Sequence, residues 1–159
     1  DHTAITWLDN WRINRILQLP LGLEYPAIIE RLSPLIQQAE HAFIDASGVG
    51  DPVFSTLSCE FQNLIGIKIT AGNSAKLTER NWTVSKRLLM QTFIHGLSSG
   101  TLKIAAADPG RTLLRDELLD FQHQGAGRSG AKAGKHDDLL LASALAVFGA
   151  AVIVGNQYY

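Results

Sequence analysis

The sequence has a single cysteine, Cys59, and a single methionine, Met90, among its 159 residues. One thiol excludes an internal disulfide framework and a zinc site built on cysteines. No stretch combines a charged lead with an apolar centre, as a secretory signal peptide does. These absences favour a globular protein of a reducing compartment.

Charged side chains are also scarce, because Asp, Glu, Lys and Arg make up 18% of the residues while 46% are hydrophobic. A disordered segment has the opposite balance. A chain of this length can bury one sizeable core, so we expect one domain over residues 1–150 and a C-terminal tail at 151–159. The sequence opens on Asp1 and not on methionine, which favours a piece of a longer protein.

Long hydrophobic runs are missing as well. The longest, at residues 139–154, is shorter than the stretch of about 18 apolar residues that a membrane-spanning helix needs. It contains Ser143 and Gly149, and two aspartates precede it. We therefore expect a buried helix here and no membrane partner.

The formal net charge of −1 hides an uneven distribution. Residues 1–60 carry a net −5, residues 61–115 a net +6 and residues 116–159 a net −2. Because DNA is a polyanion, the basic middle third is a candidate nucleic-acid surface. Lysines and arginines that only solvate helix faces explain the same excess equally well.

The apolar pattern predicts a strand pair followed by alternating helices and strands. The expected elements are strands at 3–9 and 13–19, a helix from Tyr25, a strand ending at Asp45, a short helix through Phe61, a strand at 64–70, a polar loop at 72–82, a helix around 88–97, a short strand at 101–105, a helix around 113–121, a glycine-rich loop at 125–134 and a last helix from about Asp137. This order predicts an α/β fold in which helices flank a mixed sheet.

The segment around Asp45 predicts a strand, a tight turn and a helix. A short apolar run ends on the carboxylate of Asp45. Gly48 and Gly50 allow positive φ, Asp51 can cap a helix, and Pro52 suits its first position. We therefore expect Asp45 at the tip of a strand, in a cleft at the end of the sheet, where a carboxylate can bind a metal ion.

A second acidic site, Asp137 and Asp138, begins the last apolar helix. Simple capping explains acidic residues in a first helical turn. However, the helix behind them is apolar almost all round, so it should be buried against the sheet, with its N-terminus at a sheet edge. Adjacent helical residues point about 100° apart, so one aspartate should face the cleft while the other caps or assists.

Carboxylates from distant parts of a chain suit hard divalent cations. Mg²⁺ and Mn²⁺ prefer oxygen ligands and keep waters that can act as nucleophiles. Two such ions about 3.5 to 4 Å apart can hold the attacking and leaving oxygens of a phosphodiester. Asp45 with Asp137 or Asp138 therefore indicates a candidate nuclease.

Five further residues are candidates for low-specificity contacts with DNA. They are Lys86, Arg128, Lys132, Lys135 and His136. Four of them lie in or just after the glycine-rich segment, next to the second acidic site, where a mobile loop with Arg128, Lys132 and Lys135 could touch the DNA backbone. For each residue, a solvated side chain, a plain flexible connection or a helix cap is the alternative.

Seven short motifs occur in the order found in the large subunits of phage terminases. They are Asp1-x-Thr3-Ala4-Ile5, Leu19-Pro20-Leu21-Gly22-x-x-Tyr25-Pro26, Ile44-Asp45-Ala46-Ser47-Gly48-Val49-Gly50, Val84-Ser85-Lys86, Gly100-Thr101-Leu102-Lys103-Ile104, Asp116-Glu117-Leu118-x-x-Phe121 and His136-Asp137-Asp138-Leu139. Up to about Gly149, the chain resembles the C-terminal nuclease domain of these proteins. That domain belongs to the RNase H-like superfamily, with the RuvC resolvases. Each motif is weak alone, and the ordered set is much more specific.

The resemblance implies an RNase H-like fold and a two-metal endonuclease that uses two Mg²⁺ or Mn²⁺ ions to cut concatemeric viral double-stranded DNA during packaging. It implies an upstream ATPase domain in the same protein, the portal and the small terminase subunit as partners, and the host cell cytoplasm as location. By the resemblance, Asp45 is the second metal-binding acid, and Asp137 or Asp138 is the third. Glu117 also matches a family position, although its amphipathic helix favours a structural role.

The first metal-binding acid of the family lies on the opening strand of the sheet, a few residues before the segment that matches Asp1-His2-Thr3. This sequence begins after that point. We therefore expect residues upstream of Asp1 to supply a strand in the middle of the sheet and its carboxylate. A hairpin paired directly with the Asp45 strand would contradict this expectation.

Two other functions fit the same residues. A junction-resolving or transposase nuclease of the same superfamily would require structure-specific cutting of branched DNA. A non-catalytic module would use the basic middle third to bind DNA or a protein partner. The cut-site rule, the choice between Mg²⁺ and Mn²⁺ and the oligomeric state stay open.

Overall fold

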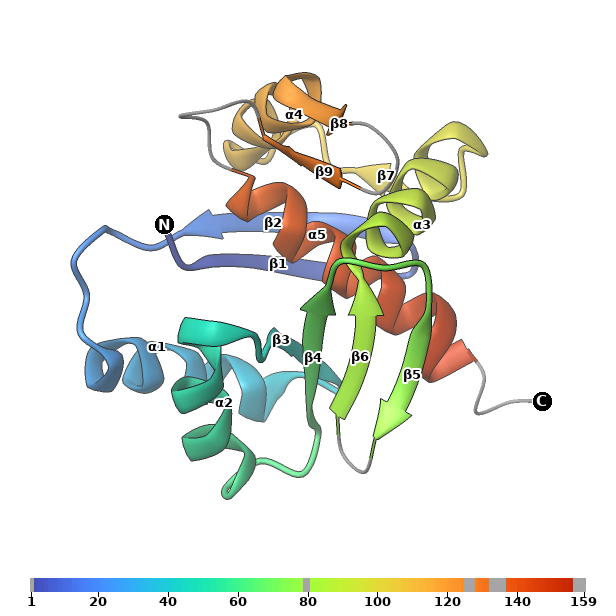
Figure 1. Ribbon diagram of the computed structural model, residues 1–159. Coiled ribbons are helices and arrows are strands. Elements are labelled where there is room, and N and C mark those ends of the chain that lie inside the picture. Colours follow the sequence, from blue (N-terminus) through green and yellow to red (C-terminus); the bar gives the residue numbers. More distant parts are fainter. Residues whose placement is uncertain (1, 79–80, 125–127, 132–136, 156–159) are drawn as a thin grey trace.

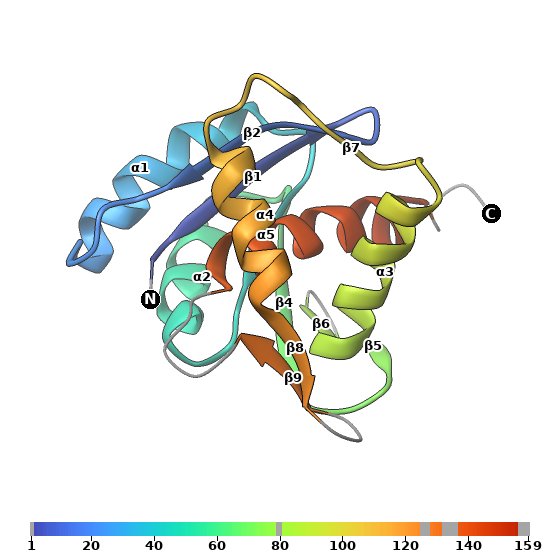
Figure 2. The same cartoon turned by 90° about the horizontal axis from the view of Figure 1, so that it is seen from above.

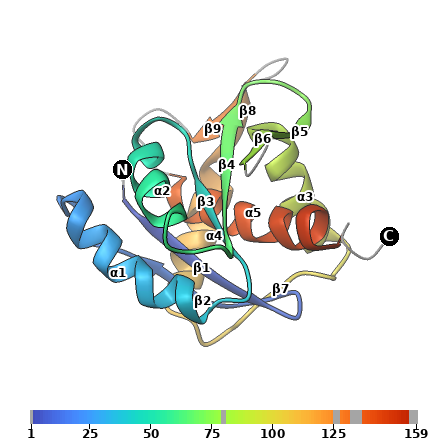
Figure 3. The ribbon, with the colours of Figure 1, turned by 90° about the horizontal axis from the view of Figure 1, so that it is seen from below.

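The structure is a computed structural model that describes all residues except 1, 79–80, 125–127, 132–136 and 156–159. The described strands form two main sheets, ordered β1-β2-β7 and β3-β4-β6-β5, and a separate two-stranded hairpin (Figure 1). Helices lie on both sides of these sheets (Figures 2 and 3). The predicted α/β fold with a mixed sheet flanked by helices is confirmed.

The first sheet is built on an antiparallel hairpin of β1 (Ala4–Asp9) and β2 (Arg12–Gln18). Asn10 and Trp11 join the two strands with φ values of 47° and 59°, as the twist of a two-residue hairpin loop requires. Strand β7 (Lys103–Ile104) adds to β2 in parallel. Among the described strands, β1 therefore pairs on one side only.

Three strands of the second sheet run parallel, namely β3 (Ala42–Asp45), β4 (Leu64–Thr70) and β6 (Asn81–Ser85). Strand β5 (Ala75–Thr78) pairs antiparallel with the outer edge of β6. Our prediction of a polar loop over 72–82 was wrong. Strand β5 lies at the outer edge of the sheet, where a strand needs apolar side chains on its inner face alone, so its composition looks like that of a loop.

Five α-helices lie within the described residues. They are α1 (Tyr25–Gln38), α2 (Asp51–Ser58), α3 (Lys86–Ser98), α4 (Gly110–Asp120) and α5 (Asp138–Phe148). Helices α1 and α2 contact each other, and α2 contacts β3 and β4. Helix α5 contacts α3, α4 and the strands β1, β2 and β3, so it bridges the two sheets (Figure 1).

The core is centred on α5, as its sequence predicts. Its buried side chains with at most 1% exposure are Leu139, Leu140, Ser143, Ala144, Val147 and Phe148. Beyond α5 the chain continues as a π-helix, η2 (Gly149–Val154). Within the described ranges, none of the helices has the length and apolar character needed to cross a membrane.

The predicted glycine-rich loop over 125–134 was wrong in part. Strands β8 (Phe121–Gln124) and β9 (Arg128–Ala131) form an antiparallel hairpin. Backbone pairing requires no apolar side chains, so the sequence Arg-Ser-Gly-Ala contains no strand signal. Residues 132–134 lie outside the described residues.

Gly149 directly follows α5 and packs against β3, the strand that carries Asp45. A Cβ atom at Gly149 would overlap the ring of Phe43 on β3. Gly149→Ala should lower the free energy of unfolding by about 1 kcal/mol, because overpacking costs about 1 to 3 kcal/mol and alanine returns part of this through its helix propensity. When Phe43 is also replaced by alanine, Gly149→Ala should no longer lower the free energy of unfolding, because the ring that it would overlap is gone. Urea denaturation of the unmodified protein, the two single variants and the double variant measures this. Strictly additive effects of the two substitutions would contradict the contact.

Candidate metal centre

Asp45 is the last residue of β3, as predicted. Its Oδ1 accepts a hydrogen bond from the Ser47 N–H at 2.8 Å, which closes a tight turn. The Ala46 N–H donates to the Ile67 carbonyl at 2.9 Å, and the Ser47 hydroxyl accepts from the Ile69 N–H at 2.7 Å. The turn that orients the carboxylate is therefore fixed to β4.

The chain enters α2 through a short 3-10 turn, η1 (Gly48–Gly50). Gly48 has the positive φ that we predicted, 49°, whereas Gly50 has a φ of −78°. Gly50 is required for a different reason, since a Cβ atom there would overlap the backbone carbonyl of Asp45. The prediction that Asp51 caps α2 was wrong, because η1 leads straight into the helix and Asp51 already has helical φ and ψ.

Asp137 and Asp138 begin α5, Asp137 as the residue before the helix and Asp138 as its first residue. Asp137 Oδ2 lies 2.6 Å from Lys86 Nζ, and both side chains are largely buried, at 18% and 27% exposure. Asp138 Oδ2 accepts a hydrogen bond from the His2 backbone N–H at 3.0 Å. The Asp137 side chain makes no capping hydrogen bond to α5, so simple capping does not explain it.

The start of α5 is capped from a neighbouring helix. Glu117 on α4 accepts a hydrogen bond on Oε2 from the Leu140 N–H at 2.8 Å. Burial raises the pKa of Glu117 and the charges of Asp138 and Asp137 add to the rise, while the hydrogen bond from Leu140 opposes it. The structural role predicted for Glu117 is confirmed, because this residue holds the first turn of α5 in place.

Glu117 offers a matched pair of substitutions. Glu117→Ala should lower the free energy of unfolding by about 1 kcal/mol, as the loss of a helix cap does. Glu117→Gln should change it by less than about 0.5 kcal/mol, because the amide oxygen can accept the same N–H and carries no charge. Chemical denaturation will measure both, and equal losses would contradict the capping role.

The stability difference between the unmodified protein and Glu117→Gln should depend on pH. Because the pKa of Glu117 is higher in the folded state than the ordinary value of 4.5, protonation stabilises the folded protein. Relative to Glu117→Gln, this stabilisation should be complete below pH 4.5 and disappear as the pH rises through the folded-state pKa.

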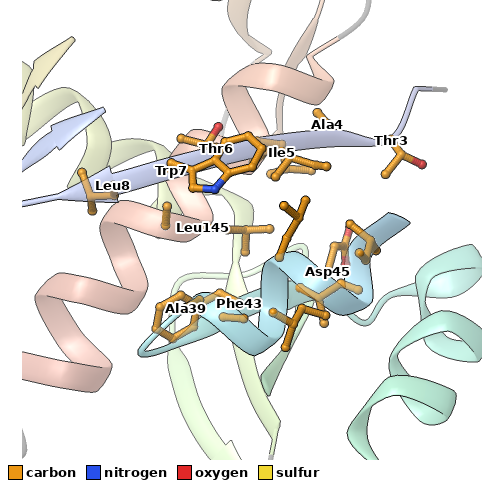
Figure 4. A pocket seen from close by; sticks show the side chains of 18 of the residues that line it. Thr3, Ala4, Ile5, Thr6, Trp7, Leu8, Ala39, Phe43, Asp45 and Leu145 are labelled. Carbon is orange, nitrogen blue, oxygen red and sulfur yellow. The ribbon is translucent and has the colours of Figure 1, made fainter. Parts of the chain in front are cut away.

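Asp45, Asp137 and Asp138 line one cavity of about 1060 Å³. Figure 4 shows Asp45 at one end of this cavity, beneath the first residues of β1. Helix α5 contacts β3, the strand that ends at Asp45. The three aspartates therefore share one cavity, and their meeting at a single metal site stays a prediction.

The carboxylates have the chemistry that Mg²⁺ and Mn²⁺ require, since both ions prefer oxygen donors. However, the part of the chain that the structure describes contains no group of three His, Cys, Asp or Glu side chains that could hold a metal ion. Asp45 and Asp137 each have one oxygen engaged with a protein donor. These residues fit a divalent cation in kind, and a complete ligand set needs a further donor.

The remaining predicted DNA contacts are only partly observable. Lys86 forms the ion pair with Asp137, so its role in DNA binding stays a prediction. Lys132, Lys135 and His136 lie outside the described residues, and for Arg128 only the backbone, in β9, is described.

Sequence reasoning missed the structural role of Ser47, although a serine directly after Asp-Ala and before glycine is typical of a tight turn.

No family model and no curated protein sequence matches the chain. Among solved structures, the large terminase nuclease from thermophilic phage G20c with bound magnesium matches 92% of this chain and 74% of that chain, with a TM-score of 0.66 and 22% identity. The same nuclease with bound cobalt matches over 92% and 81%, with a TM-score of 0.60 and 19% identity. The resemblance expected from the motifs is confirmed at the level of the fold, and the chain has the RNase H-like fold of a phage large terminase nuclease.

Proposed function

We propose that this chain is a metal-dependent endonuclease domain of a phage DNA-packaging terminase. The observation that supports it most is the shared cavity: Asp45 ends β3, Asp137 and Asp138 begin α5, and all three line the same space. The G20c nuclease has been solved with magnesium and with cobalt. A divalent cation in the shared cavity suits these carboxylates.

Asp45 and one or both of Asp137 and Asp138 would hold the metal. We propose two ions, either Mg²⁺ or Mn²⁺. Such ions supply charge neutralisation and activation of a water for attack on a phosphodiester. The role of the protein's own residues is to hold the carboxylates in position before DNA binds. The Ser47 N–H orients Asp45, and the ammonium group of Lys86 orients Asp137.

A further carboxylate completes the proposed ligand set. Repulsion between close carboxylates would be large without cations, so an additional acid and the metal ions would bind together. We assign this acid to a segment that precedes Asp1 in the parent protein. The domain boundaries 1–150 and the tail 151–159 are part of the same proposal.

Double-stranded DNA is the proposed substrate, with the portal, the small terminase subunit and an upstream ATPase domain as partners in the host cytoplasm. A sequence pI of about 6.6 predicts weak affinity of the isolated domain for DNA. Attachment to a motor that already holds DNA would raise the effective DNA concentration at the site. Low affinity of the domain alone is therefore compatible with cutting during packaging.

The proposed activity is tested with protein expressed from its full reading frame and supercoiled plasmid. Nicking and linearisation should occur with Mn²⁺ or Mg²⁺ and stop when EDTA removes the metal. Binding without cutting under every divalent metal would contradict the proposal and favour the non-catalytic module. A strong preference for four-way junctions would contradict it in favour of a resolvase.

A further inference from the structure

The first sheet carries three exposed cations on neighbouring strands. Arg12 and Arg15 lie on β2 and Lys103 lies on β7. Arg12 and Lys103 are register partners, so their side chains leave the sheet next to each other, on strands about 5 Å apart. Within the part of the chain that the structure describes, none of the three forms an ion pair. Their charges are therefore available to a ligand.

A β-bulge brings the two arginines to the same face of the sheet. Residues three positions apart in a regular strand point to opposite faces. The pairing of β1 with β2 shifts register after Trp7, and Asn14 is the extra residue on β2. Arg12 and Arg15 therefore share one face. Ile13 points to the other face, where it is fully buried in the core.

Arg15 is held in position by an aromatic ring. Its guanidinium carbon lies 5.0 Å from the centre of the Trp7 ring, within the range of a cation–π contact. A guanidinium stacked on a ring keeps its N–H groups free to bind a planar or tetrahedral anion. The one acid within β1, β2 and β7 is Asp9, in register with Arg12. Three cations and one acid leave this face positively charged.

Trp11 occupies a backbone position that disfavours a bulky side chain. It is the second residue of the turn between β1 and β2, with a φ of 59°. Glycine is strongly preferred at this position, and a positive φ is a genuine outlier for a large residue. The side chain is nevertheless 37% exposed, so complete burial does not compensate for the strain. Strained positions of this kind cluster at functional sites.

The turn lies beside β7, away from the candidate metal centre. The Lys103 N–H donates to the Trp11 carbonyl at 2.9 Å, and Figure 3 shows the turn at the periphery of the molecule. Figure 4 places Thr3 at the Asp45 end of β1. Six residues of β1 at about 3.3 Å each separate the turn from that end by about 20 Å. This length corresponds to about six base pairs of duplex DNA at about 3.4 Å each. One duplex can therefore reach both places.

We propose that Arg12, Arg15, Lys103 and Trp11 form a second DNA-binding surface, which contacts the phosphate backbone of double-stranded DNA outside the cleavage site. The three cations pair with phosphates, and the indole N–H of Trp11 donates to a backbone oxygen. We call these four residues the hairpin surface. The inference rests on the proposed function, since DNA is the ligand in both, but it involves none of the metal-binding aspartates. Backbone contacts carry no sequence information, which fits low specificity.

The salt dependence of DNA binding tests the cations. Fluorescence anisotropy with a duplex of about 30 base pairs, in EDTA, measures the affinity of the protein expressed from its full reading frame between about 50 and 200 mM salt. Replacing Arg12, Arg15 and Lys103 together by glutamine should lower the slope of log K against log salt by about 2 to 3, because each phosphate contact contributes about 0.9. An unchanged slope would overturn the proposal in favour of an acidic protein partner.

Two single substitutions provide a matched comparison. Lys103→Gln should lower the slope by about 0.9. Lys76→Gln removes the same charge from an exposed position on β5, in the other sheet, and should leave the slope unchanged. Equal effects of the two substitutions would show that only net charge matters, which would overturn a defined surface on β2 and β7.

Trp11→Gly separates binding from folding. Glycine adopts the positive φ without strain, so the melting temperature should change by no more than about 3 °C. The affinity for the duplex should fall about fivefold, as expected for one lost hydrogen bond with its contact. A large loss of stability with unchanged affinity would show that Trp11 only packs within the protein, which would overturn its place in the surface.

Plasmid cleavage with Mn²⁺ distinguishes this surface from the proposed nuclease activity. The triple glutamine variant should need at least about tenfold more DNA for half-maximal cleavage, with a smaller effect on the maximal rate. A variant that binds and cuts like the unmodified protein would overturn the surface and leave the proposed function standing. Binding that depends on the surface in a protein that cuts with no metal would support the surface and contradict the nuclease.

Discussion

Asp45→Asn should lower the rate of plasmid cleavage more than a hundredfold without unfolding the domain. Asparagine has nearly the same shape, and its side-chain oxygen can still accept the Ser47 N–H, so the turn after β3 should persist. What is lost is the negative charge that a divalent cation requires. Loss of a residue that only supports a metal ligand costs about 10 to 100-fold in affinity or activity, so loss of a ligand should exceed this.

The initial rate of plasmid nicking with Mn²⁺ measures this effect, and Asp51→Asn is the matched control. Asp51 lies six residues further along, but its side chain is 53% exposed, it contacts Lys68 at 3.9 Å, and it does not line the cavity. The control should cut like the unmodified protein. Cleavage by Asp45→Asn within a few-fold of that rate would exclude Asp45 as a ligand.

Gly50→Ala should damage both stability and activity. The new Cβ would meet the backbone carbonyl of Asp45, and a backbone atom cannot move away by changing a rotamer. Overpacking of this kind costs about 1 to 3 kcal/mol, and we expect the upper end of that range. Displacement of Asp45 by about 1 Å should also lower the cleavage rate about a hundredfold.

Thermal and urea unfolding, with plasmid cleavage measured on the same samples, will separate the two effects. Gly72→Ala is the control, because a Cβ atom at Gly72 would meet no other atom within 4 Å and the residue has no positive φ. It should be neutral in both measurements. A Gly50→Ala protein with unchanged stability and rate would show that the Asp45 turn is not closely packed.

The elements that lead to the candidate site could be predicted from local sequence. The apolar run ending at Asp45 is short and its flanking glycines are clear, and the last helix is apolar almost all round. Both features depend on residues close together in the chain, where pattern and propensity apply. That Asp45, Asp137 and Asp138 line one cavity followed from fold-level reasoning about strand ends and buried helices.

The parts that could not be predicted depend on residues far apart in the chain. The cap on α5 comes from Glu117, and the partner of Asp137 is Lys86, 51 positions away. Neither contact leaves a local signal in the sequence. Strands β5 and β9 were missed because outer strands and hairpins are held by backbone pairing, which polar and glycine-rich sequences also support.

The apolar run of β3 predicts a buried strand, and the structure leaves it half-buried at the edge of its sheet. The edge position explains this difference, because a strand that lacks one neighbour cannot be covered along that edge. The apolar sequence of β3 therefore fits a strand with partners on both sides. The same reasoning applies to β1, whose residues 4–8 are half-buried as well.

The central claim is that Asp45 and the Asp137–Asp138 pair hold a divalent cation together. A crystal of the protein expressed from its full reading frame, soaked in Mn²⁺, tests this by anomalous diffraction at a wavelength where manganese scatters strongly. We expect a peak about 2.0 to 2.3 Å from a carboxylate oxygen of Asp45 and from one of Asp137 or Asp138. A fully soaked crystal with no peak between them, or with manganese bound only elsewhere, would contradict it.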